Sequence, residues 1–235
     1  MKFDFKEFSI QQKNTAMKVG TDGVLLGAWV SIKNKPSTIL DIGTGTGLIA
    51  LQLAQRSDAE LIDAIEIQDE AFEEAVFNFE QSSWSDRLFC YHASLFEFVN
   101  EIEDKYDLIV SNPPFYTDNY ESNNNARNQA RFTSSLSFDE LLESVAFLLS
   151  KQGVFNVIIP FKEEALFLEI AANFNLFPSR ICRVKGNVNS VCKRSLIELS
   201  FNKVTVIKEK LTIEIDRHIY TGAYINLVKD FYVKM

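Results

Sequence analysis

The chain is predicted to form an α/β fold, a doubly wound and mostly parallel sheet with an antiparallel hairpin near its C-terminus. An apolar run at 38–40 leads through a glycine-rich turn at 43–47 into helical spacing at 48–54. Such a strand–turn–helix unit begins a doubly wound sheet. Strand-like and helical apolar segments then alternate along most of the chain, which is typical of parallel βα units.

The remaining elements follow from the periodicity of the apolar residues. A short helix is expected at 22–31, before the first strand, and Gly153 is expected to end a helix at 138–149. The other expected elements are strands at 60–66, 87–91, 107–111 and 154–159, helices at 69–81 and 162–174, a hairpin at 180–185 and 195–201, a strand at 211–215 and a helix from Gly222.

Length and composition limit the class of protein. A chain of 235 residues without an internal repeat or linker is expected to be a single domain, 1–235. It has no apolar run long enough to span a membrane, and residues 1–6 do not resemble a secretory signal, so we expect a cytoplasmic protein. The three cysteines and two histidines have no metal-ligand spacing, so we expect no metal, and no feature indicates an obligate protein partner.

The net charge of −8 is unevenly distributed. Residues 57–107 hold fifteen acids and two bases, whereas residues 1–35 hold six lysines and three acids. Residues 180–195 hold five bases and no acid. Because phosphate binding needs a local basic face and not a basic protein, a nucleic-acid partner stays possible. Ordinary solvated surface explains each basic stretch equally well.

The segment from Asp41 to Gly47, Asp-Ile-Gly-Thr-Gly-Thr-Gly, is expected to be a cofactor loop. Glycines allow sharp turns and close approach of a ligand, because no Cβ intervenes. Glu66 ends the second strand roughly 20 residues later, where such folds place the acid that binds a ribose. A nicotinamide-binding fingerprint is one alternative, but Asp41 would repel a pyrophosphate and suits the sulfonium and ammonium of S-adenosylmethionine. A tight turn without a ligand is the other alternative.

The segment Asn112-Pro113-Pro114-Phe115 is expected to be the chemistry loop. The preceding strand delivers Asn112 to the carboxyl edge of the sheet, beside the glycine loop. The two prolines extend the backbone and remove two N–H donors, so the side-chain carbonyl of Asn112 and the main-chain carbonyl of Pro113 remain as acceptors. Two fixed acceptors would orient an exocyclic amino group, and Phe115 offers a face for stacking a base. A proline turn that only ends a strand is the alternative.

On these two motifs, at 40–47 and 112–115, the chain resembles class I S-adenosylmethionine-dependent methyltransferases that methylate amino groups. In its length and in the stretches 8–12 and 17–29 it is similar to the bacterial tRNA1(Val) adenine-37 N6-methyltransferase family. The resemblance implies a Rossmann-like methyltransferase sheet, S-adenosylmethionine as cofactor and tRNA as substrate. It also implies that residues 1–35 cover the cofactor, and the same segment is a candidate RNA contact. It implies cofactor contacts for Thr21, Asp22, Gly23, Asp41, Gly43, Gly45, Gly47 and Glu66, and catalytic roles for Asn112, Pro113, Pro114 and Phe115.

Two further regions bear on the expected site. Many relatives carry an Asp after the third strand, near the cofactor adenine, and Ser94 is the closest substitute in this chain. Residues 116–135 lack periodicity and are expected to be a flap that orders on RNA, or else a disordered insertion. Contacts with the RNA substrate are expected from Arg127, Arg131, Arg180, Arg183, Lys193 and Arg194.

The function predicted from the sequence is methyl transfer to the N6 amino group of a tRNA adenine, by direct attack and without a strong general base. The adenine would have to be splayed out of its loop to reach Asn112. The alternatives are the same chemistry on another RNA base or on a protein glutamine amide, and a non-catalytic cofactor- or RNA-binding module. Asn112 and Glu66 argue against the binding module. A dehydrogenase is disfavoured because we can name no acid/base residue for hydride transfer.

Overall fold

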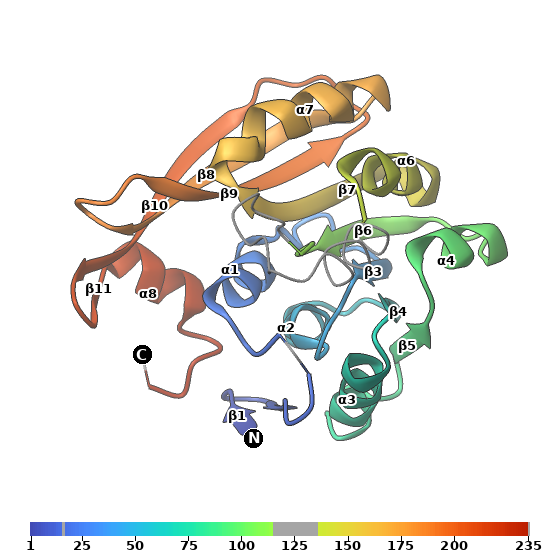
Figure 1. The fold of residues 1–235 in the computed structure, drawn as a ribbon, viewed down its shortest axis with the longest axis horizontal. Coiled ribbons are helices and arrows are strands. Elements are labelled where there is room, and N and C mark those ends of the chain that lie inside the picture. The colour runs from blue at the N-terminus through green and yellow to red at the C-terminus, as the bar shows by residue number, and fades with distance from the viewer. Residues whose placement is uncertain (16, 115–135, 235) are drawn as a thin grey trace, which may run out of the picture.

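The computed structural model describes residues 1–235 except 16, 115–135 and 235. Within the described residues, a nine-stranded sheet has the order β11-β10-β8-β9-β7-β6-β3-β4-β5, and β1 and β2 form a separate two-stranded sheet (Figure 1). The strands are β1 (Lys2–Asp4), β2 (Ser9–Gln11), β3 (Thr38–Ile42), β4 (Leu61–Glu66), β5 (Leu88–His92), β6 (Tyr106–Ser111), β7 (Leu149–Pro160), β8 (Phe177–Asn187), β9 (Cys192–Ser200), β10 (Ile207–Asp216) and β11 (Ile219–Tyr220). The helices are α1 (Thr21–Trp29), α2 (Leu48–Arg56), α3 (Asp69–Glu80), α4 (Leu95–Glu101), α6 (Phe138–Leu148), the 3₁₀ helix η1 (Phe161–Glu163), α7 (Glu164–Asn173) and α8 (Gly222–Val228).

The half of the sheet made of β5, β4, β3, β6 and β7 is parallel throughout. The chain enters this half of the sheet at β3 and adds β4 and then β5 on one side. It then returns to the other side of β3 to form β6 and β7. This reversal of strand order beside β3 is the point where open α/β sheets bind their ligands. The predicted doubly wound sheet is therefore confirmed.

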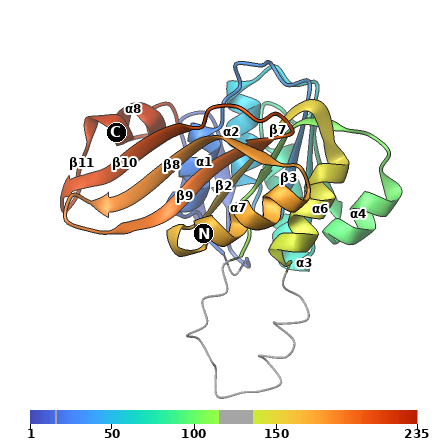
Figure 2. The ribbon, with the colours of Figure 1, turned by 90° about the horizontal axis from the view of Figure 1, so that it is seen from above.

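The other half of the sheet contains the predicted antiparallel hairpin. Strand β9 pairs antiparallel with both β7 and β8, whereas β10 runs parallel to β8 on its outer side. The short strand β11 closes the edge antiparallel to β10. Figure 2 shows these outer strands extending away from the parallel half of the sheet.

Helices cover both faces of the sheet and enclose two apolar layers. One layer contains buried residues of α1, α2 and α3, such as Leu25, Leu51 and Phe79. The other contains buried residues of α4, α6 and α7, such as Phe98 and Phe167. Burial of these large side chains fixes each helix against its face of the sheet, because about 1.5–3 kcal/mol is gained per buried apolar side chain.

Two details differ from the sequence prediction. Helix α6 ends at Leu148 and β7 begins at the next residue, so Gly153 lies inside a strand and does not end the helix. A Cβ on Gly153 would lie 2.8 Å from the carbonyl oxygen of Tyr106, so close packing of β7 on β6 explains this glycine. Helix α4 was not expected, although Ser94 and Glu97 form a capping box at its start.

Candidate active site

The motif residues converge because the strands that carry them are direct neighbours. Ile42 at the end of β3 pairs with Ser111 of β6 on one side and with Ile65 of β4 on the other. The residues that follow these three, Gly43, Asn112 and Glu66, therefore emerge together at the carboxyl edge of the sheet. Hydrogen bonds tie the strand ends together: Ser111 Oγ donates to the carbonyl of Ile42, and the amide of Gly43 donates to the carbonyl of Ile65.

The glycine loop needs its glycines for two different reasons. Gly43, Gly45 and Gly47 all have left-handed backbone conformations, with φ of 68°, 60° and 82°. A Cβ on Gly43 or Gly45 would meet no atom within 4 Å, so both residues border open space. A Cβ on Gly47 would lie 2.4 Å from a ring carbon of Phe79, so this residue also allows α3 to pack closely.

Asp41 lies beneath the loop, with an exposed fraction of 0%. Its Oδ2 accepts hydrogen bonds from the hydroxyl of Thr44 and from the amide of Ala50 in the first turn of α2. Its Oδ1 is buried and has no hydrogen-bond partner among the described residues. Burial raises the pKa of this carboxyl to about 7, with a smaller contribution from the nearby Glu66 charge, while the two hydrogen bonds oppose the rise.

Glu66 fastens the loop to the end of β4. Its Oε2 accepts the amide of Gly45 at 2.8 Å, and its Oε1 accepts the amides of Ile67 and Gln68, each at 2.9 Å. A carboxylate has about four acceptor positions, so roughly one remains for an outside donor such as a ribose hydroxyl. Ile67, which directly follows Glu66, is apolar yet 52% exposed. Ile67 was not predicted from the sequence, although it directly follows Glu66.

Asn112 emerges from β6 with an unused acceptor. Its side-chain oxygen is buried and has no hydrogen-bond partner among the described residues. Pro113 is buried and Pro114 is exposed, as an extended strand exit would place them. Phe115, Arg127, Arg131 and the flap expected at 116–135 lie outside the described residues. An unpartnered buried acceptor costs about 1–3 kcal/mol, so an N–H donor from a ligand would relieve that cost.

Ser94 already has a structural partner. Its hydroxyl accepts the amide of Glu97 and donates to the Glu97 carboxylate, which in turn accepts the Ser94 amide. This capping box begins α4 at the same sheet edge, where the amide of Ala93 donates to the carbonyl of Glu66. A contact between Ser94 and the cofactor adenine stays a prediction, and it would have to share this hydroxyl.

The segment before α1 is held over the glycine loop by two inward side chains of α3. Glu74 accepts the backbone amides of residues 13–15. Asn78 exchanges hydrogen bonds with the backbone of Gln11 and also donates to the carbonyl of Thr46 at 2.9 Å. These two residues were not predicted, because acids and amides on an amphipathic helix ordinarily face solvent.

Thr21, Asp22 and Gly23 form the first turn of α1. Thr21 is exposed, whereas a Cβ on Gly23 would lie 3.0 Å from a methyl group of Leu48, so this glycine allows α1 to approach α2. Asp22 Oδ2 accepts a hydrogen bond of 2.7 Å from Arg194 Nε at the start of β9. Asp22, which is expected to contact the cofactor, thus forms an ion pair with Arg194, which is expected to contact the RNA.

The basic residues of 180–195 do not form one surface. Arg180 stacks 3.8 Å over the ring of Trp29 in α1, on one face of the sheet. Arg183 donates a hydrogen bond to Glu164 at the start of α7, on the other face of the sheet. Residues three apart in a strand point to opposite sides, so the single basic surface expected from the sequence is not formed. Lys193 is exposed.

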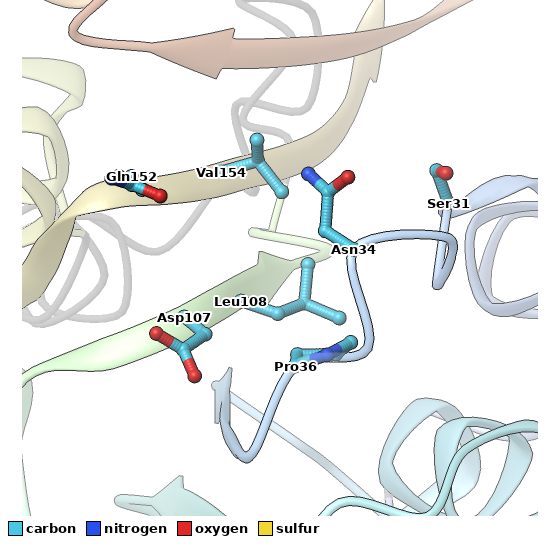
Figure 3. A pocket seen from close by; sticks show the side chains of 7 residues that line it. All are labelled: Ser31, Asn34, Pro36, Asp107, Leu108, Gln152 and Val154. Atoms are coloured by element: carbon cyan, nitrogen blue, oxygen red, sulfur yellow. The ribbon is translucent and has the colours of Figure 1, made fainter.

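A separate pocket lies at the opposite edge of the sheet. It has a volume of about 300 Å³ and is lined by the residues of Figure 3, among them Asp107 near the start of β6 and Gln152 near the start of β7. Ligands of open α/β sheets bind at the carboxyl ends of the strands, whereas this pocket lies at the amino ends. It is therefore distinct from the motif residues. Among the described residues, no helix is long and apolar enough to cross a membrane, and no group of three His, Cys, Asp or Glu is placed to hold a metal.

Residues 23–135 match the family described as Methyltransferase small domain. The chain is 58% identical over 99% of its length to a tRNA1(Val) (adenine(37)-N6)-methyltransferase of Christiangramia forsetii, covering 98% of that protein. It is 59% identical over 99% of its length to the protein of the same name from Flavobacterium psychrophilum, covering 100% of it. A methyltransferase from Pyrococcus furiosus shares the fold, with a TM-score of 0.60 at 20% identity, 83% of this chain and 90% of that chain being covered.

The sheet order, the glycine loop and these similarities define a class I S-adenosylmethionine-dependent methyltransferase. With full-length relatives at 58% and 59% identity, the chain belongs to the tRNA1(Val) (adenine(37)-N6)-methyltransferase family.

Proposed function

We propose that this enzyme transfers a methyl group from S-adenosylmethionine to the N6 amino group of adenine 37 in tRNA1(Val). The observation that carries the proposal is the buried, unpartnered side-chain oxygen of Asn112, which follows the register partner of Ile42 and so lies beside the glycine loop. An acceptor fixed at that place suits an exocyclic amino group, which has two N–H donors. The names of the full-length relatives supply the nucleotide and the tRNA.

The described residues fit the cofactor. Gly43 and Gly45 border open space, Glu66 keeps roughly one acceptor position, and Ile67 offers exposed apolar surface for an adenine ring. When bound, S-adenosylmethionine supplies an electrophilic methyl group on a positively charged sulfur. We assign cofactor contacts to the segment at 21–23, to the glycine loop with Asp41 beneath it, to Glu66 and to Ser94.

The substrate amine is bound by Asn112 and by the main-chain carbonyl of Pro113. Two acceptors in fixed positions orient the N6 group and hold its lone pair toward the methyl donor, so proximity and orientation supply much of the rate. Pro114 keeps the loop extended, and Phe115 stacks on the splayed base. The N6 proton leaves to solvent after transfer, so the site needs no strong general base.

We also propose that residues 1–235 act as one methyltransferase domain, in which residues 1–35 cover the cofactor. The two ends of the chain support this, because Phe5 bridges to Tyr232 and the Lys6 ammonium donates to the carbonyl of Lys229. The three cysteines are all free, which fits a reducing cytoplasm where tRNA is the partner. We propose RNA contacts for six basic residues, Arg127, Arg131, Arg180, Arg183, Lys193 and Arg194.

The test uses the purified enzyme, S-adenosylmethionine and two tRNA1(Val) transcripts, one with adenine 37 and one with guanine there. Nucleoside mass spectrometry is expected to find N6-methyladenosine only in the first transcript. Methylation at another base, or of a glutamine amide in an added protein, would replace adenine 37 as the target. Cofactor binding by calorimetry without turnover on any of these would indicate a binding module.

A further inference from the structure

One face of the two outer strands β8 and β10 is basic. Alternation along the strands places Arg183 and Lys185 of β8 on the side of the sheet where α7 lies, together with Lys208 and Lys210 of β10. Lys208 and Lys210 are exposed, and Arg183 and Lys185 are partly exposed. We call these four residues the basic strip. In Figure 1, α7 lies on this side of the sheet, and α1 and α8 lie on the other.

The strip holds more positive charge than its surroundings neutralise. Lys210 is the register partner of Arg183, and like charges in such neighbouring positions destabilise a sheet. Glu164 pairs with Arg183 at 2.6 Å and also attracts Lys208, whereas none of the three lysines makes an ion pair with a described residue. The next acid along this face of β10 is Glu214, beyond the strip. On a protein of net charge −8, this local excess suits an external polyanion.

Arg183 links the strip to the edge of the sheet that carries the chemistry. Its guanidinium is fixed by Glu164, whose buried carboxylate also accepts the hydroxyl of Ser195. The guanidinium carbon lies 5.3 Å from the ring centre of Phe161, which directly follows the carboxyl end of β7. Strands β9 and β7 separate β8 from β6, which delivers Asn112, so the strip starts at the same edge of the sheet as Asn112 and continues outward over β8 and β10.

We propose that the basic strip binds the phosphate backbone of the tRNA next to the target adenine. The proposal rests on the proposed function. If the enzyme methylates a tRNA base, the RNA backbone on either side of that base must leave the site across a neighbouring protein surface. Lys208 and Lys210 of β10 and Lys185 of β8 supply point charges for phosphates, while Glu164 keeps the Arg183 guanidinium in place as the contact nearest the site. RNA is favoured over an acidic protein because the strip starts at the same edge of the sheet as the site that receives the base.

The test compares two triple variants with equal loss of charge. The strip variant is Lys185→Gln/Lys208→Gln/Lys210→Gln. The control variant is Lys151→Gln/Lys203→Gln/Lys229→Gln, whose lysines are exposed and lie outside both the basic strip and residues 1–35. Affinity for tRNA1(Val) is measured by fluorescence anisotropy at several salt concentrations, together with steady-state methylation and calorimetric S-adenosylmethionine binding.

For the strip variant, the slope of log affinity against log salt is expected to become shallower by about 2–3, since each lost phosphate contact removes roughly 0.7–0.9. KM for tRNA should rise more than tenfold, while kcat and cofactor affinity stay within twofold. An unchanged slope in the strip variant, or an equal change of slope in the control variant, would contradict the proposal that the basic strip binds tRNA. An acidic protein bound by the wild type in place of tRNA would overturn it too. Failure of the wild type to methylate tRNA would instead refute the proposed function.

Discussion

Arg194 Nε donates a hydrogen bond of 2.7 Å to Asp22 Oδ2, across 172 positions of the chain. The pair joins the start of β9 to the first turn of α1, and the side chains of Arg194 and Asp22 are 33% and 28% exposed. Asp22 is assigned to the cofactor side of the site and Arg194 to the RNA side. A substitution at either position therefore disturbs both, and the two residues cannot be interpreted as independent contacts.

The first prediction concerns this pair. Asp22→Asn and Arg194→Gln are each expected to weaken S-adenosylmethionine binding several-fold, because the first turn of α1 loses its anchor. The double variant should lose less than the sum of the two, with a coupling of about 0.5–1 kcal/mol for a partly exposed pair. Calorimetric titrations of all four proteins measure the coupling, and Lys193→Gln on the same strand is the matched control. Strictly additive losses would show that the ion pair does not connect the two sides.

The second prediction concerns Asn112. Asn112→Ala is expected to lower kcat by at least a hundredfold, because the amine loses its positioned acceptor, while cofactor affinity changes less than threefold. Rapid-quench turnover and calorimetry separate the two effects. Ser111→Ala on the same strand is the control, since it removes only the hydrogen bond to the Ile42 carbonyl. Loss of cofactor binding in Asn112→Ala with normal turnover at saturating cofactor would mean that Asn112 belongs to the cofactor site.

The third prediction separates the two roles of glycine in the loop. Gly45→Ala and Gly47→Ala both place a Cβ on a left-handed residue, which costs about 1–2 kcal/mol. Only Gly47→Ala also drives the Cβ into Phe79, so it should unfold at clearly lower urea concentration. Gly45→Ala should fold yet bind cofactor at least tenfold more weakly, because its Cβ enters the open side of the loop. Equal urea midpoints for the two variants would contradict this division.

The sequence was sufficient to predict the parts of the site that follow from strand order. Gly43 and Asn112 each directly follow a buried strand and Glu66 is the last residue of another, and parallel strands bring such residues to one edge. Two further features of the structure also follow from local patterns in the sequence. The Ser94–Glu97 capping box predicts the start of α4. The spacing of Arg180 and Arg183 places their side chains on opposite faces of a strand.

Other features depend on contacts that no local pattern encodes. The register of β10 on β8, which sets Lys210 beside Arg183, joins segments far apart in sequence that share no turn. The hydrogen bonds from residues 13–15 to Glu74 likewise depend on how the N-terminal segment crosses α3. Both the β10–β8 register and the contacts with Glu74 are determined by the packing of the whole sheet and its helices. The sequence therefore predicted which strand ends lie together better than it predicted the surfaces around them.

The last prediction concerns Asp41, whose pKa is raised to about 7 by burial from its ordinary value of 3.8. Between about pH 4 and pH 7 the folded protein retains a proton that the unfolded chain has released. The free energy of unfolding therefore falls as pH rises through this window, and the loss is complete above about pH 7. Asp41→Asn removes the titration, so its stability relative to the wild type should increase from pH 5 to pH 7 and then level off.

Urea unfolding at pH 5, 6, 7 and 8 checks this expectation for Asp41. Thr44→Val is the informative companion, because it keeps the carboxyl group but removes a hydrogen bond that lowers its pKa. In that variant the pKa should rise further, so the decline in stability should continue to higher pH than in the wild type. Parallel pH profiles for the wild type and Asp41→Asn would mean that Asp41 stays ionised beneath the loop, its charge held by the Thr44 hydroxyl and the Ala50 amide alone.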